Sequence, residues 1–216
     1  MKNIFLFKVF ISFAFSCCLA LTVAHSYDPK EGNVSATFGP FVHKTNYPGS
    51  TSGVISPWMG APAMIVQGDF TDYSSLEIAF FHLNKVFIRE EGGRYISEET
   101  QSLHTTFGYR YWYNPYLSFS GSLFTAYTMG EPKIVHSDFT PPDYIATSAR
   151  DIVEYGIDFS IQQELMSFET INIVADLRYS LSVTNKISEY GDHYGLMIGV
   201  KYLIQERFKR DSSFPQ

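Results

Sequence analysis

The residues most able to do chemistry are nine ionisable side chains at the polar positions of stretches that otherwise alternate polar with apolar residues. They are Asp69, Glu77, Arg110, Glu154, Asp158, Glu164, Asp176, Arg178 and Lys201. If these positions face an enclosed interior, the six acids and three bases predict a hydrogen-bonded ion network with trapped water, because an isolated buried charge is strongly destabilising. The alternative is a proton- or ion-conducting path lined by the surplus carboxylates. The expected partner of Arg178 on the preceding stretch is Asp158 or Glu154.

Four histidines are candidates for catalysis or metal binding: His82, His104, His136 and His193. His104 stands beside Thr106 on a polar face, but no serine and acid accompany it at the spacing of a catalytic triad. Glu189, Asp192 and His193 offer one imidazole and two acids in a loop, which is a weak signal for a divalent metal. The sequence therefore predicts no catalytic residue, no metal and no cofactor.

The elements that must position these charges have a period of two, which is typical of β-strands. In Thr170 to Thr184 the apolar residues from Ile171 to Val183 occupy alternate positions, and Val174 is the one apolar residue on the polar face. Eight such segments are predicted, starting at Asn33 and ending at Ile204. After the first segment at Val34–Phe38 they are Met64–Phe70, Leu76–Ile88, Leu103–Tyr113, Tyr116–Met129, Asp151–Leu165, Thr170–Thr184 and His193–Ile204.

Two segments depart from strict alternation. His82 and Asn84 interrupt an apolar face, so a β-bulge at Phe80-Phe81 is expected to shift that face to Leu83 and Phe87. Pro40 cannot donate a ladder hydrogen bond, and a second bulge is expected there.

The connections between segments alternate between long and short without exception. The long ones are 43–61, 89–102, 130–150 and 185–192, and the short ones are 71–74, 114–115 and 166–169. In an antiparallel meander this pattern places every long loop at one end and every tight turn at the other, as in transmembrane β-barrels. The long loops, rich in Gly, Ser, Pro and aromatic residues, are where a specific function is expected.

Three features predict that the apolar face meets lipid and the polar face lines a lumen. The polar face is built from Ser, Thr, Gly, Asn and Gln with almost no Lys. Tyrosines gather at strand ends, as at Tyr109, Tyr111 and Tyr113, in the manner of an interfacial girdle. Strands of about 11 residues suffice to cross a bilayer at a tilt of about 45°. The predicted fold is therefore all-β, an eight-stranded antiparallel up-and-down transmembrane β-barrel spanning residues 27–204.

The first 26 residues have the organisation of a secretory signal peptide. Lys2 and Lys8 precede an apolar stretch from Val9 to Val23, and cleavage is expected after Ala24 or Ser26. The alternative is a lipoprotein signal at Cys17 or Cys18, which lacks the usual aliphatic residue before it. Cleavage would leave a mature chain without cysteine. A net charge of −6 with no basic cluster argues against nucleic acid as a partner.

The pattern from Asn33 to Ile204 resembles the small eight-stranded bacterial outer-membrane barrels, the group of OmpX and the OmpA transmembrane domain. Gly199, Tyr202 and Ile204 resemble the last-strand signal read by the barrel-insertion machinery, although a periplasmic tail of residues 205–216 follows here. The resemblance implies an outer-membrane protein in contact with lipids, including lipopolysaccharide. A structural or surface-interaction role without enzymatic activity is expected, its surface ligand unidentified; the alternatives are a lipid A-modifying enzyme and a channel for small solutes or hydrophobes.

Overall fold

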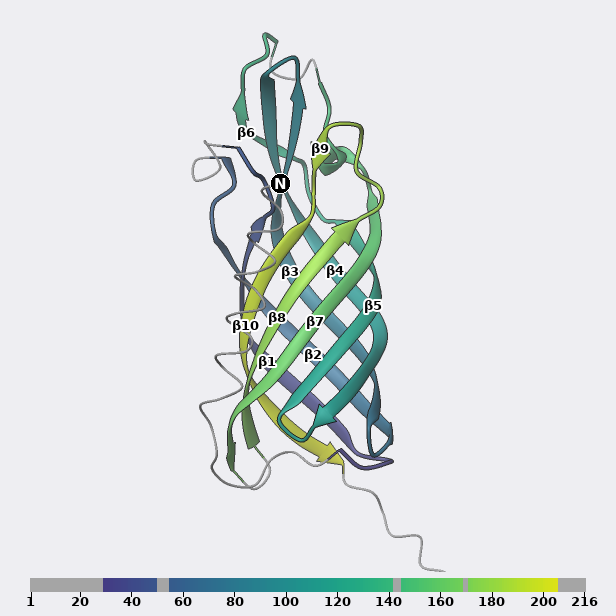
Figure 1. The fold of residues 1–216 in the computed structure, drawn as a ribbon. Helices are drawn as coiled ribbons and strands as arrows, with labels where there is room; N and C mark the ends of the chain where they lie inside the picture. Colours follow the sequence, from purple (N-terminus) through teal and green to yellow (C-terminus); the bar gives the residue numbers. More distant parts are fainter. Residues whose placement is uncertain (1–28, 50–54, 142–144, 169–170, 206–216) are drawn as a thin grey trace, which may run out of the picture.

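Eight antiparallel strands close into a ring in the computed structural model, which describes residues 29–49, 55–141, 145–168 and 171–205 (Figure 1). The ring strands are β1 (Val34–Thr45), β2 (Met59–Thr71), β3 (Ser74–Glu91), β4 (Arg94–Asn114), β5 (Leu117–Thr128), β7 (Val153–Phe168), β8 (Ile171–Ser182) and β10 (His193–Gln205). Each strand pairs with the next, and β10 pairs back with β1. The predicted eight-stranded up-and-down barrel is confirmed. No helix among the described residues is long and apolar enough to cross a membrane.

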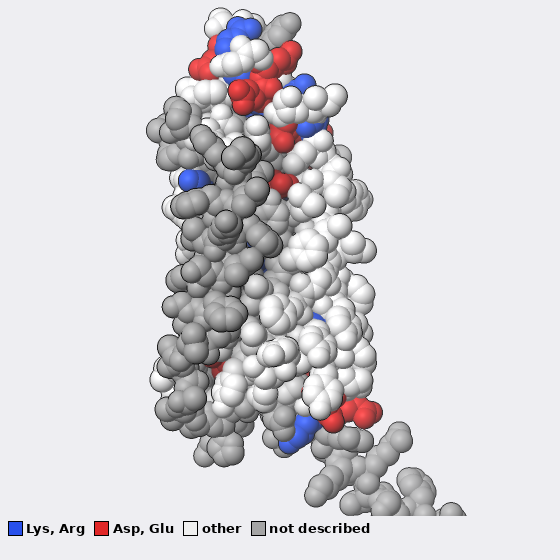
Figure 2. Space-filling view, viewed as in Figure 1, with Lys and Arg blue, Asp and Glu red and all other residues white. Residues whose placement is uncertain are grey.

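The barrel turns its apolar side chains outward and its polar side chains inward. In β8 the side chains of Asn172, Asp176 and Arg178 are buried, whereas Ile171 at the end of the strand is exposed. The side chain of Leu123 on β5 is 69% exposed. In a water-soluble barrel, an apolar residue of the core would be buried. Figure 2 shows a wall that is largely free of charge between charged side chains gathered at the two ends. This inverted polarity is that of a barrel surrounded by lipid.

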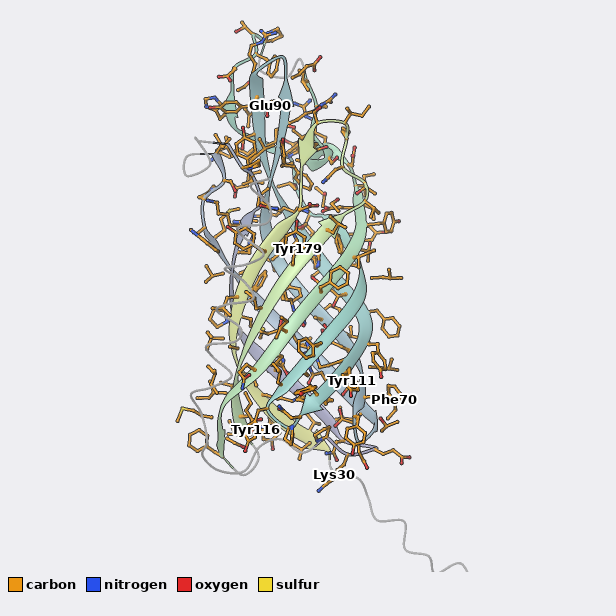
Figure 3. All side chains as sticks on the ribbon, in the orientation of Figure 1. Lys30, Phe70, Glu90, Tyr111, Tyr116 and Tyr179 are labelled. Atoms are coloured by element: carbon orange, nitrogen blue, oxygen red, sulfur yellow. The ribbon has the colours of Figure 1, made fainter. Side chains whose placement is uncertain are left out.

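Exposed tyrosines mark two levels on the wall. Figure 3 shows Tyr111, Tyr116 and Phe70 near the end that carries the short turns. Tyr127 of β5 lies at the other level, toward the long loops, where it is the strand partner of Leu103 of β4. The interval from Leu103 to Tyr111 corresponds to roughly 20 Å along the barrel axis, at about 3.3 Å per residue and about 40° of tilt. The two levels are therefore spaced like the aromatic girdles of a membrane-spanning band.

The expected bulge at Phe80-Phe81 is wrong. Strand β3 pairs with β4 in one unbroken register from Ser74 opposite Tyr111 to Glu91 opposite Arg94. His82 therefore points outward, and Phe81 points into the lumen. The lumen accepts Phe81 because its lining on this side is itself apolar. The buried cluster there consists of Phe41, Ala61, Ala63, Ile65, Ala79, Phe81, Leu83 and Met197.

The bulge expected at Pro40 is also wrong. Phe38 pairs with Val200 and Phe41 with Met197, so the β1–β10 register is the same on both sides of Pro40. The ladder passes Gly39 and Pro40 without an inserted residue. Gly39 permits this because a Cβ atom at that position would collide with the backbone of β10.

The link between β3 and β4, expected to be a long loop over 89–102, is a turn at Gly92-Gly93, where both glycines have positive φ. The two strands instead continue beyond the ring and stay paired as far as Glu91 and Arg94. Both are longer than a strand needs to be to cross the membrane-spanning band. Two short strands join them there: β6 (Lys133–Ser137) pairs with β4, and β9 (Glu189–Tyr190) pairs with β3. We call this four-stranded extension the rim sheet: β3 and β4 from residue 86 to residue 99, with β6 and β9.

Leu177 tests the lipid-facing assignment, because it lies at the middle of β8 between Ile161 and Leu196 of the neighbouring strands. We expect Leu177→Arg to lower the free energy of unfolding by about 2 to 4 kcal/mol, the cost of a cation near the bilayer midplane. Leu181→Arg, beyond Tyr179 and near the end of the same strand, should cost about 0 to 1 kcal/mol. The measurement is urea unfolding from phosphatidylcholine vesicles. Equal costs at both positions would contradict a lipid-facing strand.

Candidate functional site

The lumen holds an ion cluster, which we define as Glu77, Arg110, Asp158, Asp176 and Arg178. Arg178 donates from Nε to Asp176 Oδ1 at 2.6 Å. Its Nη1 donates to Asp158 Oδ1 at 2.8 Å, and its Nη2 to Glu77 Oε1 at 2.6 Å. One guanidinium on β8 thus binds carboxylates of β3, β7 and its own strand across the lumen.

Arg110 on β4 is the second centre of the cluster. Its Nε donates to Glu77 Oε2 at 2.6 Å, and its Nη2 donates to Asp176 Oδ2 at 3.1 Å. The remaining donors reach Ser118 of β5 and Ser160 of β7, both at 2.8 Å. The guanidinium is fully buried, so each of these bonds replaces one to water.

The cluster contains three carboxylates and two guanidinium groups, and neutral side chains donate to the surplus negative charge. Ser180 Oγ donates to Asp158 at 2.6 Å, and Gln67 Nε2 donates to Glu77 at 3.1 Å. Ser160 and Gln162 lie within hydrogen-bonding distance of Asp176. Every member therefore has close partners, which is what a buried charge network needs to be stable.

The other four predicted lumen residues make separate contacts. Of the two partners expected for Arg178, Asp158 is the one that binds it, and Glu154 pairs with Lys85 of β3 instead. The β7–β8 register explains this, because Ser160 lies opposite Arg178 and Glu154 falls beyond the last paired residue of β8. The remaining three contacts lie toward the short-turn end: Asp69 accepts from Ser75, Glu164 accepts from Asn172, and the Lys201 ammonium lies 4.3 Å from the Trp112 ring centre.

Lys85 is a lumen residue that the sequence analysis missed. The expected bulge in β3 assigned it to the outer face. With the alternation unbroken, Lys85 lies an even number of residues from Glu77 and shares its inward face. Strict alternation of inward and outward side chains along β3 would have identified Lys85 as a lumen residue.

Above the ion cluster the lumen is filled by rings and aliphatic side chains. Phe81 connects the two regions, because the Arg178 guanidinium lies 5.1 Å from its ring centre. His104 faces the lumen as predicted and is buried, and its ring centre lies 5.3 Å from that of His193. The His193 ring lies 5.9 Å from that of His43.

The residues considered for a metal site do not converge. His193 points into the lumen, whereas Asp192 accepts from the Ser182 backbone N–H and Glu189 binds Ser148. Among the described residues, no group of three His, Cys, Asp or Glu side chains is placed to hold a metal ion.

A short loop segment packs against β3 and β4 at the end of the barrel that carries the long loops. We call it the mouth cap: Thr147 and the 3₁₀ helix η1 (Ser148–Arg150). The buried Glu98 carboxylate accepts from Thr147 Oγ1 at 2.7 Å and from Arg150 Nη2 at 2.6 Å. Glu189 accepts from the Ser148 backbone N–H at 2.6 Å. These contacts join loop residues to β4 and β9, and no periodic pattern in the sequence indicates them.

The residues of the expected insertion signal lie on β10. Tyr202 and Ile204 point outward and are exposed, and Gly199 packs closely against Thr37 of β1. The expected signal peptide of residues 1–26 and the tail after Gln205 lie outside the described residues.

Comparison with known proteins finds likeness in structure alone. No family model and no curated protein matches the sequence. The outer membrane protein OprG from Pseudomonas aeruginosa superposes with a TM-score of 0.51 at 12% identity, over 84% of this chain and 100% of that chain. The fold is that of the small outer-membrane β-barrels. Ail, the attachment invasion locus protein of Yersinia pestis, aligns over 80% of this chain and 99% of its own, with 13% identity and a TM-score of 0.45.

Arg178→Ala tests the ion cluster. It would leave Glu77 and Asp176 with Arg110 as their one guanidinium partner in the cluster, and Asp158 with none. We expect the free energy of unfolding to fall by about 3 to 5 kcal/mol, the cost of removing one partner from a buried charge network. The control is Leu177→Met on the outer face of the same strand, expected to cost less than about 1.5 kcal/mol. Urea unfolding from lipid vesicles measures both, and equal values would indicate a lumen that solvates its own charges.

Proposed function

We propose that this protein is an integral outer-membrane barrel that conducts no solute and acts at the cell surface through its rim sheet. The observation that carries the proposal is the filled lumen. Three successive layers occupy it: the ion cluster, the layer around Phe81 and His104, and the Lys85–Glu154 pair beneath the mouth cap. An eight-stranded barrel is just wide enough for side chains to fill its interior.

The rim sheet supports a role at the surface. From Arg94 to Ser102, β4 continues past the level of Leu103 and the outer aromatic girdle, a further length of about 30 Å along the strand at about 3.3 Å per residue. Figure 1 shows the β3–β4 hairpin rising above the ring beside β6. A structure built only to span the membrane does not need this extension. It therefore favours contact with something outside the cell.

The proposed location includes the outer membrane, with the long-loop end outside and the short turns on the periplasmic side. Export through a cleaved signal peptide, insertion by the barrel machinery and contact with lipopolysaccharide belong to the same proposal. Its support is the exposed apolar wall between two aromatic levels, together with the fold shared with OprG.

A non-enzymatic role is part of the proposal, and the surroundings of the histidines support it. His136 Nε2 lies 3.0 Å from Asp138 Oδ1, the type of pair that activates a serine. The serine opposite His136 is Ser97, which is buried and donates its hydroxyl to the Ile55 carbonyl. That hydroxyl is not positioned as a nucleophile.

Conductance of the full-length protein in planar bilayers tests the proposal. We expect no stepwise current in potassium chloride, with a trimeric porin as the positive control and vesicle flotation to show that the barrel has inserted. The reason is that Arg110 and Arg178 together bind carboxylates on opposite sides of the lumen. Reproducible unit conductance from the inserted wild-type protein would replace this proposal with the channel alternative.

A further inference from the structure

Three tyrosines and two carboxylates gather on the outward face of the rim sheet. We call them the tyrosine patch: Tyr47, Glu90, Tyr95, Asp138 and Tyr190. The Tyr47 and Tyr190 ring centres lie 5.1 Å apart with planes inclined at 73°. Each of the three rings is half-buried, so each keeps part of its surface accessible.

The register of the rim sheet places these residues on one face. Glu90 on β3 pairs with Tyr95 on β4, and Tyr190 on β9 pairs with Ile88, two residues from Glu90. Asp138 is held beside Tyr95, because its backbone N–H donates to the Tyr95 carbonyl. Tyr47 follows β1 and packs with Tyr95 and Tyr190 against a buried cluster of Ile55, Val86 and Ile88. This packing fixes the rings before any partner arrives, which lowers the entropic cost of binding.

The patch carries negative charge next to the rings. The hydrogen bond from His136 lowers the pKa of Asp138, so its carboxylate is ionised at neutral pH. Burial raises the pKa of Tyr47, and the negative charges of Glu90 and Asp138 raise it further. The side chains of Asp138 and His136 are bound to each other. The Glu90 carboxylate has no hydrogen bond or ion pair within the described part of the chain, so it is available to a ligand.

We propose that the tyrosine patch binds an arginine side chain of an extracellular protein partner. A guanidinium group stacks on tyrosine faces and donates paired hydrogen bonds to a carboxylate. The patch offers the faces of Tyr47 and Tyr190 for the first contact and Glu90 for the second. A quaternary ammonium group has no N–H to donate to Glu90, and an anionic partner would be repelled by the two carboxylates. The inference rests on the proposed role at the cell surface and names the chemistry of the partner.

The test measures binding of a short glycine-spaced arginine peptide to the full-length protein in detergent micelles. The lysine version and the citrulline version, an uncharged isostere of arginine, serve as comparison peptides. We expect the arginine peptide to bind about fivefold more tightly than the lysine peptide, and the citrulline peptide to show no saturable binding. Tetramethylammonium should not compete at concentrations equal to the peptide.

Variants locate the site. Glu90→Gln and Tyr190→Leu should each weaken binding of the arginine peptide by about fivefold or more. Asp151→Asn is the matched control, because it removes one exposed carboxylate outside the tyrosine patch and should change the Kd by less than about twofold. Equal weakening by Asp151→Asn and Glu90→Gln would overturn the inference in favour of attraction by net charge. Effective competition by tetramethylammonium would also overturn it.

The peptide test and the conductance test fail independently. A conducting barrel that still binds the arginine peptide through Glu90 would remove the proposed function and leave the tyrosine patch in place. A barrel that does not conduct and binds no arginine peptide would overturn the tyrosine-patch inference and leave the proposed function in place.

Discussion

Two arginines bridging three carboxylates across a closed ring of strands are the interaction on which the rest of this structure depends. Arg178 joins β8 to β3 and β7, and Arg110 joins β4 to β3, β5, β7 and β8. Lipid around the barrel cannot form hydrogen bonds with charged side chains, so each charge must find its hydrogen-bond or ion-pair partners within the lumen. The two guanidinium groups therefore link five of the eight ring strands through the lumen.

The upper half of the lumen is filled by different means. The Phe81 ring contacts the Arg178 guanidinium and leads into an apolar layer, in which buried histidine rings pack edge to face. This layer separates the ion cluster from the Lys85–Glu154 pair and the mouth cap. Side chains therefore fill the lumen at several levels among the described residues. The rim sheet continues from this ring, and its tyrosine patch is the surface that we propose for partner binding.

Alternation alone was enough to predict the ring, the inward position of Asp176 and Arg178, and the outward position of Leu177. The sequence analysis was wrong where it expected every lumen position to be polar: that assumption led to a bulge at Phe81 and removed Lys85 from the lumen. It also interpreted 89–102 as a loop, because charged residues beyond the membrane band obscured strands that continue there. The Glu98–Arg150 contact and the approach of Tyr47 to Tyr190 depend on how loops fold back in space. No spacing along the chain encodes such contacts.

The central claim is that the lumen charges act as one coupled network across the barrel. A double-mutant cycle on Glu77 and Arg178, with both residues changed to alanine singly and together, tests this claim most directly. Urea unfolding from lipid vesicles would give the four free energies of unfolding. The account predicts a coupling energy of about 2 kcal/mol or more, because each single change removes one oppositely charged partner from a buried charge network. Additive effects, with coupling below about 0.5 kcal/mol, would contradict it.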